Sequence, residues 1–340
     1  MILRFLSIFV VGLIVFSGGC RELTSDRLYA LYLDRDPVVA DWERALPRTV
    51  YVKGGQLNKV EKIGDIDQDT VHTSTASCHH GAALPDPVAV DLRAFYTDND
   101  LFLRLSWKDA TRDEAIREWS FDGQKWHSSN AAEDGFGILW DTVGLNDFSC
   151  SYACHIDDFG VQGSNFHARN KMKLVSGDSR RFDLWNWKAR RTGHFGFADD
   201  RMIDANGIHP DASGDIFTPN SHSAARADDT AFVPGDRPLY DAEGLPIDQQ
   251  FHVAGSRAPG YLTSRPRSGR ADVAAFQDYA DGRWTVILRR KLQTDDVDDV
   301  IFTSDNGRGV AFGLSLMDNT LFEHYASTTA ERLVLLPKKR

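Results

Sequence analysis

Short stretches in which apolar and polar residues alternate are the main pattern along this chain. Two of them, at 87–95 and 101–107, are separated by the turn-forming segment Thr-Asp-Asn-Asp. A period of two residues predicts a strand with one buried face, so we expect a hairpin here. Further strands are predicted at 136–140, 182–187, 283–292, 310–318 and 331–337.

No long amphipathic helix competes with these strands. Many short strands with Gly, Asp and Asn turns predict an all-β fold, and specifically a β-sandwich with long loop insertions. We place the sandwich at 46–337 and expect the polar stretch 20–45 to be a tether or an early helix. The segment at about 193–280 is rich in Gly, Pro, Asp and Ser. It predicts a loop-rich excursion that covers a site or docks a partner.

The N-terminus has the pattern of an export signal. Arg4 precedes an apolar stretch from Phe5 to Phe16 that is short for a membrane span, and small residues follow at 17–19, directly before Cys20. We expect residues 1–19 to be a signal peptide. Small residues that end at a cysteine are typical of a bacterial lipoprotein, in which Cys20 would carry the lipid. An ordinary cleaved signal or an uncleaved anchor is the alternative, and each reading places the folded part outside the cytoplasm.

Composition narrows the function classes. The formal net charge is −10, which argues against nucleic-acid binding because phosphates require a basic surface. The sequence contains no G-x-S-x-G, P-loop, H-E-x-x-H or G-x-G-x-x-G motif, so it offers no hydrolase or nucleotide site. We expect no catalysis by this chain alone.

The cysteines leave several interpretations open. Beyond Cys20 there are Cys78, Cys150 and Cys154, and an odd number in an oxidising compartment leaves at least one unpaired, bound to a cofactor or paired between chains. The segment from Cys150 to His155 is one residue longer than the haem-attachment motif C-x-x-C-H. It is compatible with a local disulfide, with thioether bonds to haem or with another metal.

Five segments occur in a characteristic order: "DLRAFYTDNDLFLRLSWKDATRDE", "EDGFGILWDT", "CSYACH", "KMKLVSGDSRRFDLWNWKARRTGHFGFADD" and "GRWTVILRRKL". Together they resemble the haem-binding domain of the ethylbenzene dehydrogenase γ subunit and related periplasmic cytochrome proteins. The resemblance covers about residues 85–336, and its most specific part is the W-x-W-K segment at 185–188, followed by "ADD". It implies a sandwich of the DOMON or CBM9 carbohydrate-binding-module type.

The resemblance also implies a cofactor and its ligands. In the γ subunits a b-type haem is held by a methionine shortly before W-x-W-K and by a lysine near the C-terminus. Met172 matches the methionine, and His324 stands at the lysine position, a departure that gives a chemically reasonable Met/His pair. His155 is the substitute iron ligand, and a c-type haem would use Cys150 and Cys154. Three residues of the motif would then lie at the haem, with the lysine on a propionate or the ring face: Trp185, Trp187 and Lys188.

These expectations combine into one function and one rival. The chain is expected to be a periplasmic, lipid-anchored, haem-binding electron-transfer protein. The resemblance implies redox partners such as the iron–sulfur subunit of a molybdenum enzyme or a soluble cytochrome. The rival is the same sandwich without haem, binding a carbohydrate or another ligand through exposed tryptophans.

Overall fold

The computed structural model describes residues 27–53, 86–142, 144, 181–204, 207–221, 237–247, 252–267, 269–304, 307–319, 325–327 and 331–338. In this part of the chain the regular structure consists of strands and three short 3-10 turns, η1 (Val39–Glu43), η5 (Gly193–Phe195) and η7 (Gly269–Ala271). The all-β prediction is confirmed. No helix among these residues is long and apolar enough to cross a membrane.

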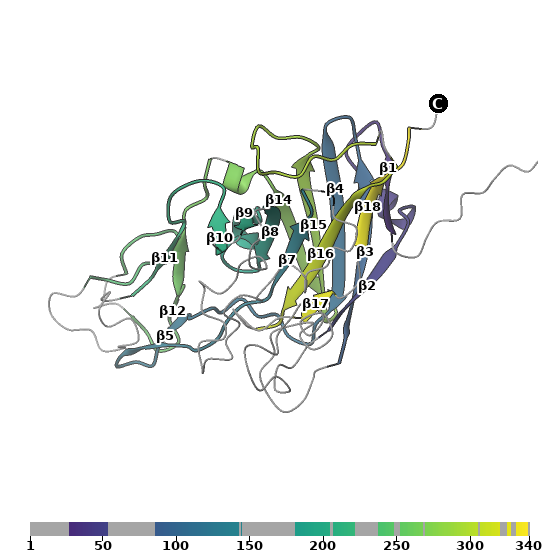
Figure 1. Cartoon of the computed structure of the whole chain (residues 1–340). Coiled ribbons are helices and arrows are strands. Elements are labelled where there is room, and N and C mark those ends of the chain that lie inside the picture. The colour runs from purple at the N-terminus through teal and green to yellow at the C-terminus, as the bar shows by residue number, and fades with distance from the viewer. Residues whose placement is uncertain are drawn as a thin grey trace, which may run out of the picture.

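One thirteen-stranded sheet folds over on itself to form the sandwich (Figure 1). One half runs in the order β10-β9-β8-β7-β16, and the other runs β2-β3-β4-β15-β14. The bounds of these strands are β2 Arg48–Lys53, β3 Val88–Tyr96, β4 Asp100–Lys108, β7 Gly135–Trp140, β8 Phe182–Lys188, β9 Asp199–Asp204, β10 Gly207–Pro210, β14 Ala274–Ala280, β15 Arg283–Lys291 and β16 Val310–Met317.

Three more strands join the two halves. β17 (Tyr325–Ser327) lies between β16 and β2 and pairs antiparallel with both. β18 (Glu331–Leu335) pairs antiparallel with β16, and β1 (Arg27–Tyr32) lies parallel to both β18 and β3. The two halves of the sheet are therefore linked at two places, once through β17 and once through β18 and β1.

The core lies between the two halves. Trp107 of β4 meets Phe136 of β7 and Trp187 of β8, with ring centroids 6.0 Å apart in each case. The outer edges of the sheet also approach one another, because the Ala198 N–H donates to the carbonyl of Val273 at 2.9 Å, just before β14. The sandwich thus resembles a flattened barrel at this edge.

The strand predictions are confirmed for the sandwich. The expected hairpin is β3 and β4, which pair antiparallel from Val90↔Trp107 to Tyr96↔Leu101. β7 is buried at all six positions, because both of its faces are covered. Its alternate residue Leu139 packs outside the main core, in a small apolar cluster with Phe182, Ile203 and Ala311.

The N-terminal stretch differs from the expected tether. Residues 27–32, within 20–45, form β1, and its neighbours β3 and β18 are both parallel to it. Leu28 and Ala30 are fully buried in the main core. A strand covered on both faces reads as a continuous apolar run rather than as an alternation, so the period-two pattern does not detect it.

The excursion at 193–280 also contains more strands than expected. β9, β10 and β14 belong to the main sheet, while two small sheets lie to one side of the sandwich (Figure 1). They consist of β11 (Phe217–Pro219) with β13 (Tyr261–Thr263), and of β12 (Arg257–Ala258) with β5 (Trp119–Phe121) and β6 (Trp126–Ser128). The buried amide of Asn220 links their loops by donating to the carbonyls of Tyr240 at 2.8 Å and Pro259 at 2.7 Å.

Candidate functional site

The W-x-W-K segment forms β8 and its side chains divide between two faces. Trp185 and Trp187 point into the core, where the first lies 4.9 Å from Trp140 between ring centroids and the second stacks on Phe136 at 5.3 Å. Lys188 points to the opposite face, as the alternation of a strand requires. The described neighbours of both indoles are therefore core side chains.

Tryptophan exposure bears directly on the rival function. The chain has eight tryptophans, and the most exposed of them, Trp42, is only 4% exposed. The other seven are more deeply buried still. All eight tryptophans belong to the described part of the chain, and none of them is exposed there as a platform for a sugar.

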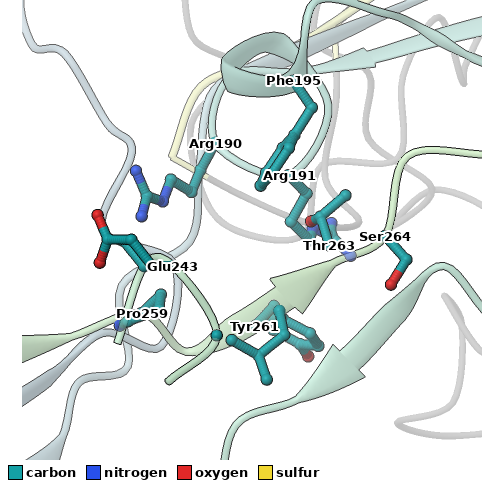
Figure 2. A pocket seen from close by; sticks show the side chains of 11 residues that line it. Arg190, Arg191, Phe195, Glu243, Pro259, Tyr261, Thr263 and Ser264 are labelled. Atoms are coloured by element: carbon teal, nitrogen blue, oxygen red, sulfur yellow. The ribbon is translucent and has the colours of Figure 1, made fainter. Parts of the chain in front are cut away.

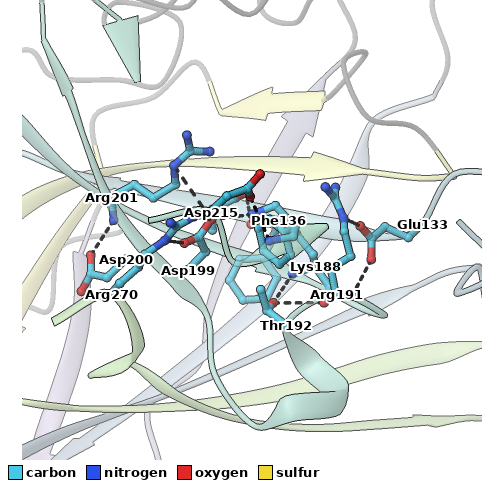
Figure 3. Close-up of polar contacts among 12 residues, drawn as sticks. Glu133, Phe136, Lys188, Arg191, Thr192, Asp199, Asp200, Arg201, Asp215 and Arg270 are labelled. Atoms are coloured by element: carbon cyan, nitrogen blue, oxygen red, sulfur yellow. Dashed lines mark hydrogen bonds and ion pairs between the residues drawn. The ribbon is translucent and has the colours of Figure 1, made fainter. Parts of the chain in front are cut away.

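Lys188 forms an ion pair inside the protein (Figure 3). Its Nζ lies 3.2 Å from Oδ2 of Asp199, a fully buried carboxylate on β9. Arg270 donates from Nε to the other oxygen of Asp199 at 2.6 Å. Burial alone would raise the pKa of Asp199, but these two cations lower it, so this carboxylate stays ionised.

The environment of Lys188 holds its ammonium form less firmly than water does. Burial lowers the pKa of Lys188 to about 7; the negative charge of Asp199 acts against this shift, and the positive charges of Arg191 and Arg201 add to it. A lysine in water titrates at about 10.4. This amine therefore exchanges its proton near neutral pH.

Phe217, the first residue of β11, is a common contact of three cations. Its ring centroid lies 5.3 Å from Lys188 Nζ, 5.1 Å from Arg191 Cζ and 5.9 Å from Arg270 Cζ. Cations are attracted to an aromatic face within about 6 Å. The Phe217 ring therefore lies against all three cations and adds a cation–π attraction to their ion pairs.

Glu133 supplies the second carboxylate. It is 2% exposed, and its Oε2 accepts the backbone N–H groups of Arg190 at 2.9 Å and Arg191 at 3.0 Å. The Arg191 side chain also forms an ion pair with it (Figure 3). We define the cationic cluster as Lys188, Arg190, Arg191 and Arg270; it has four buried or half-buried cations against the two buried carboxylates Asp199 and Glu133.

A tight turn after β8 places the two arginines. The Lys188 N–H donates to Thr192 Oγ1 at 2.8 Å, and this hydroxyl donates back to the Lys188 carbonyl at 3.1 Å. Gly193 follows, and a Cβ there would lie 2.7 Å from the indole nitrogen of Trp187 and 1.6 Å from Oε1 of Gln277. The turn can therefore pack on the core only with glycine at this position.

A pocket adjoins the cationic cluster (Figure 2). Its volume is about 340 Å³, within the range of small-molecule sites. Figure 2 shows Phe195 and Tyr261 on opposite sides and the carboxylate of Glu243 near Arg190. The lining residues are Arg190, Arg191, Phe195, Ala242, Glu243, Gly244, Pro259, Tyr261, Leu262, Thr263 and Ser264.

The remaining predicted site residues lie outside the described residues: Met172, His324, His155, Cys150, Cys154 and Cys20. For His324, the position of the next residue along the chain is described. Tyr325, which follows His324, pairs with Leu316, at the end of the sheet where Gly135 pairs with Lys188 and Met317.

Sequence reasoning identified one cation of the cluster and missed the others. The adjacent aspartates of "ADD" were a usable signal, because strand alternation must send them to opposite faces. Arg270 and Glu133 gave no local signal, since they come from positions far along the chain from β8.

Comparisons with known proteins agree with the sequence resemblance. The family model described as ethylbenzene dehydrogenase matches residues 42–325. No curated protein matches the chain.

Solved structures of carbohydrate-binding proteins cover most of the chain at low similarity. A family 9 carbohydrate-binding module from Caldicellulosiruptor kristjanssonii in complex with cellotriose is 8% identical, with a TM-score of 0.33, and covers 92% of this chain and 95% of its own. A proposed carbohydrate-binding protein from Bacteroides uniformis is 8% identical, with a TM-score of 0.36, and covers 91% of this chain and 99% of its own.

Proposed function

Because the chain belongs to the ethylbenzene dehydrogenase family, we propose that it is a haem-binding electron-transfer protein of a respiratory oxidoreductase complex. Haem, when bound, supplies a one-electron redox couple. The protein itself binds the group, shields it from water and presents it to redox partners. An iron–sulfur subunit or a soluble cytochrome would be those partners.

The observation that carries this proposal is the cationic cluster beside the pocket. Haem has two propionates, and arginine is the preferred partner of carboxylates because its guanidinium offers paired donors. In the proposal Arg190 and Arg191 bind the propionates, and the aromatic walls Phe195 and Tyr261 contact the apolar part of the ligand. Lys188 is the weaker choice for a propionate, since its single Nζ already pairs with Asp199, whereas Arg191 pairs with Glu133 through Nε and keeps its two Nη groups.

The iron ligands in this proposal are Met172 and His324. His155 is the substitute, and thioether bonds from Cys150 and Cys154 would make the haem c-type. Trp185 and Trp187 support the site from the core behind β8. The protein would be exported to the periplasm and held at the membrane through a lipid on Cys20.

The test begins with the full chain produced with export and offered haem. A reduced-minus-oxidised visible spectrum should show one low-spin haem, and acid–acetone should extract it if it is b-type. A haem that resists extraction would assign Cys150, Cys154 and His155 instead. Folded protein that takes up no haem would overturn the proposal.

Variants separate iron ligation from propionate binding. Met172→Ala and His324→Ala should each change the position and spin state of the haem bands. Arg190→Gln should leave the bands in place and weaken haem retention, as a salt-sensitive propionate contact predicts. The matched control is Arg44→Gln, since the Arg44 side chain is 73% exposed and far less constrained.

The same preparation tests the rival function. Phe195 and Tyr261 remain the aromatic side chains of the pocket, and a sugar could stack on them. A haem-free protein that binds glycans, and loses them on Tyr261→Ala, would favour the binding module.

A further inference from the structure

Three carboxylates meet in the interior at the other end of β8. Asp183 of β8, Asp200 of β9 and Asp299 of the loop after β15 each offer an oxygen within 4.8 Å of the others. Their exposed fractions are 1%, 0% and 7%. We call these residues the buried acidic group.

The sheet itself brings the first two together. Asp183 and Trp185 lie on the inward face of β8, and Asp200 is the register partner of Trp185 on β9. The loop after β15 is held against these two strands, because the Val300 N–H donates to Oδ2 of Asp183 at 2.9 Å. Asp299 is consequently held at the same place.

One cation reaches into the group. Arg290 of β15 crosses the core, and its Nη2 lies 2.5 Å from Asp299 Oδ2 and 3.7 Å from Asp183 Oδ2, while its Nε lies 3.9 Å from Asp200 Oδ2. A single positive charge therefore faces three buried carboxylates. Asp272 adds another, 4.0 Å from the same Nε.

Several carboxylate oxygens here lack a hydrogen-bond donor. Among the described residues nothing donates to Oδ1 of Asp183, Oδ2 of Asp200, Oδ2 of Asp211 or Oδ1 of Asp272. Buried acceptors are almost always satisfied in folded proteins, and leaving one unsatisfied costs stability. The first two of these oxygens belong to side chains at least 99% buried. The nearby donors Arg290 Nε and Nη2 make no hydrogen bond to a described residue either, so the polar atoms of this group are only partly matched within the fold.

Protons are one candidate partner. Burial raises the pKa of Asp183 to about 7 and that of Asp211 to about 8, with the neighbouring carboxylates adding to the effect for Asp211. Each proton, however, creates only one hydrogen-bond donor. A cation that binds several oxygens at once satisfies more of them and also neutralises the excess charge.

We propose that Asp183, Asp200 and Asp299 bind a calcium ion, with Asp211 and Asp272 at the edge of the site. Calcium takes six to eight oxygen ligands in irregular geometry, at about 2.3–2.6 Å, whereas magnesium requires a near-ideal octahedron and retains water. Five carboxylates from separate segments fit the first description. A cavity of about 430 Å³ lined by Asp299, Asp298 and Asp141 provides an entry path.

A second group of three carboxylates shows the contrast. Asp109, Asp134 and Asp318 also lie within 4.8 Å of one another. Both oxygens of Asp134 accept hydrogen bonds, from Trp284 Nε1 at 2.9 Å and the backbone N–H of Asn319 at 3.0 Å. This group therefore needs no ion to satisfy its most buried member, and it serves as an internal control.

The test uses the full chain after treatment with EDTA. Calcium should bind with one ion per chain, and the thermal unfolding midpoint should rise with calcium concentration, as for any ligand of the folded state. Terbium should replace calcium and luminesce on tryptophan excitation, since the Arg290 Cζ within the site lies 5.3 Å from the Trp185 ring. Magnesium at equal concentration should give a smaller shift.

Two isosteric variants locate the ion. Asp200→Asn and Asp183→Asn should each weaken calcium binding by at least about 10-fold, while Asp109→Asn should leave it unchanged. EDTA-treated wild type with native circular dichroism that binds no calcium would overturn the proposal, whatever the variants do. Wild-type affinity in Asp200→Asn, or an equal shift with magnesium, would also contradict it.

Discussion

Asp199 and Asp200 are consecutive residues of β9 whose carboxylates lie in opposite electrostatic environments. Both are fully buried. Asp199 faces outward from the sandwich core to Lys188 and Arg270, whereas Asp200 faces inward to other carboxylates and one arginine. An aspartate therefore stabilises the cationic cluster but adds repulsion to the buried acidic group. Asp199→Asn and Asp200→Asn should accordingly change the unfolding free energy differently.

Asp199→Asn should destabilise the protein strongly. It leaves Lys188 and Arg270 without their shared anion, and breaking a buried ion pair by removing one partner costs about 3–5 kcal/mol. Urea unfolding followed by tryptophan fluorescence measures the difference in unfolding free energy. A loss below about 1 kcal/mol, the typical value of a surface pair, would contradict the assignment of Asp199 as the anion of this cluster.

Asp200→Asn should behave in the opposite way in excess EDTA. The amide removes one of several mutually repelling carboxylates and supplies a donor to an oxygen that lacks one. We expect the unfolding free energy to stay the same or rise by about 1 kcal/mol, the usual net value of one hydrogen bond. The same urea titration at pH 7.5 measures it, and a loss as large as that of Asp199→Asn would refute the expectation.

Stability should depend on the titration of Lys188. Its pKa is about 7 in the folded protein and about 10.4 when unfolded, so the unfolded chain binds more protons between these values. Unfolding free energy of the wild type, relative to Lys188→Met, should therefore rise as pH increases from about 7 to about 10, by at most about 1.4 kcal/mol per pH unit. Below about pH 6 the difference should be flat.

Paired urea titrations across this pH range measure the effect. Lys108→Met, which removes an exposed lysine from β4, is the matched variant and corrects for the change in composition. A wild-type advantage that falls with rising pH would show that the ammonium form is the one the fold favours.

Gly260→Ala should disturb the pocket wall. A Cβ at this position would lie 2.3 Å from the carbonyl oxygen of Arg117 and 2.4 Å from that of Ile116, so backbone must move. We expect a loss of about 1–3 kcal/mol, as for other overpacked sites, together with weaker ligand binding, because Pro259 and Tyr261 on either side line the pocket.

Differential scanning calorimetry and the haem-retention assay measure the two effects. Gly269→Ala is the control, since its Cβ would come no closer than 3.6 Å to Asp296. Equal midpoints for the two variants would show that the wall is not constrained at Gly260.

Much of the fold was predictable because the pattern of a half-buried strand is local. β4 and β15 alternate apolar and polar residues, and each lies where its pattern predicts. β1 was not predictable in this way, since residues 27–32 are covered on both faces. Its burial depends on β18, whose residues follow about 300 positions later in the chain.

The site was less predictable because its charges come together only in three dimensions. The W-x-W-K segment was recognisable as a unit, yet the alternation within it sends Trp187 into the core and Lys188 to the other side of the sheet. Arg270 reaches Asp199 across 71 positions and Arg290 reaches Asp183 across a greater distance in sequence. No spacing rule connects such residues, and only the sheet register places them together.

The parallel pairing of β1 with β18 bears on the order of events during synthesis. Arg27 pairs with Arg332 and Ala30 with Leu335. The pairing of β1 with β18 therefore forms only after β18 has been synthesised. Contacts of such long sequence separation form late and slowly. Because synthesis begins at the N-terminus, the β1–β18 pairing, and with it this closure of the sheet, cannot form until residue 335 has been made.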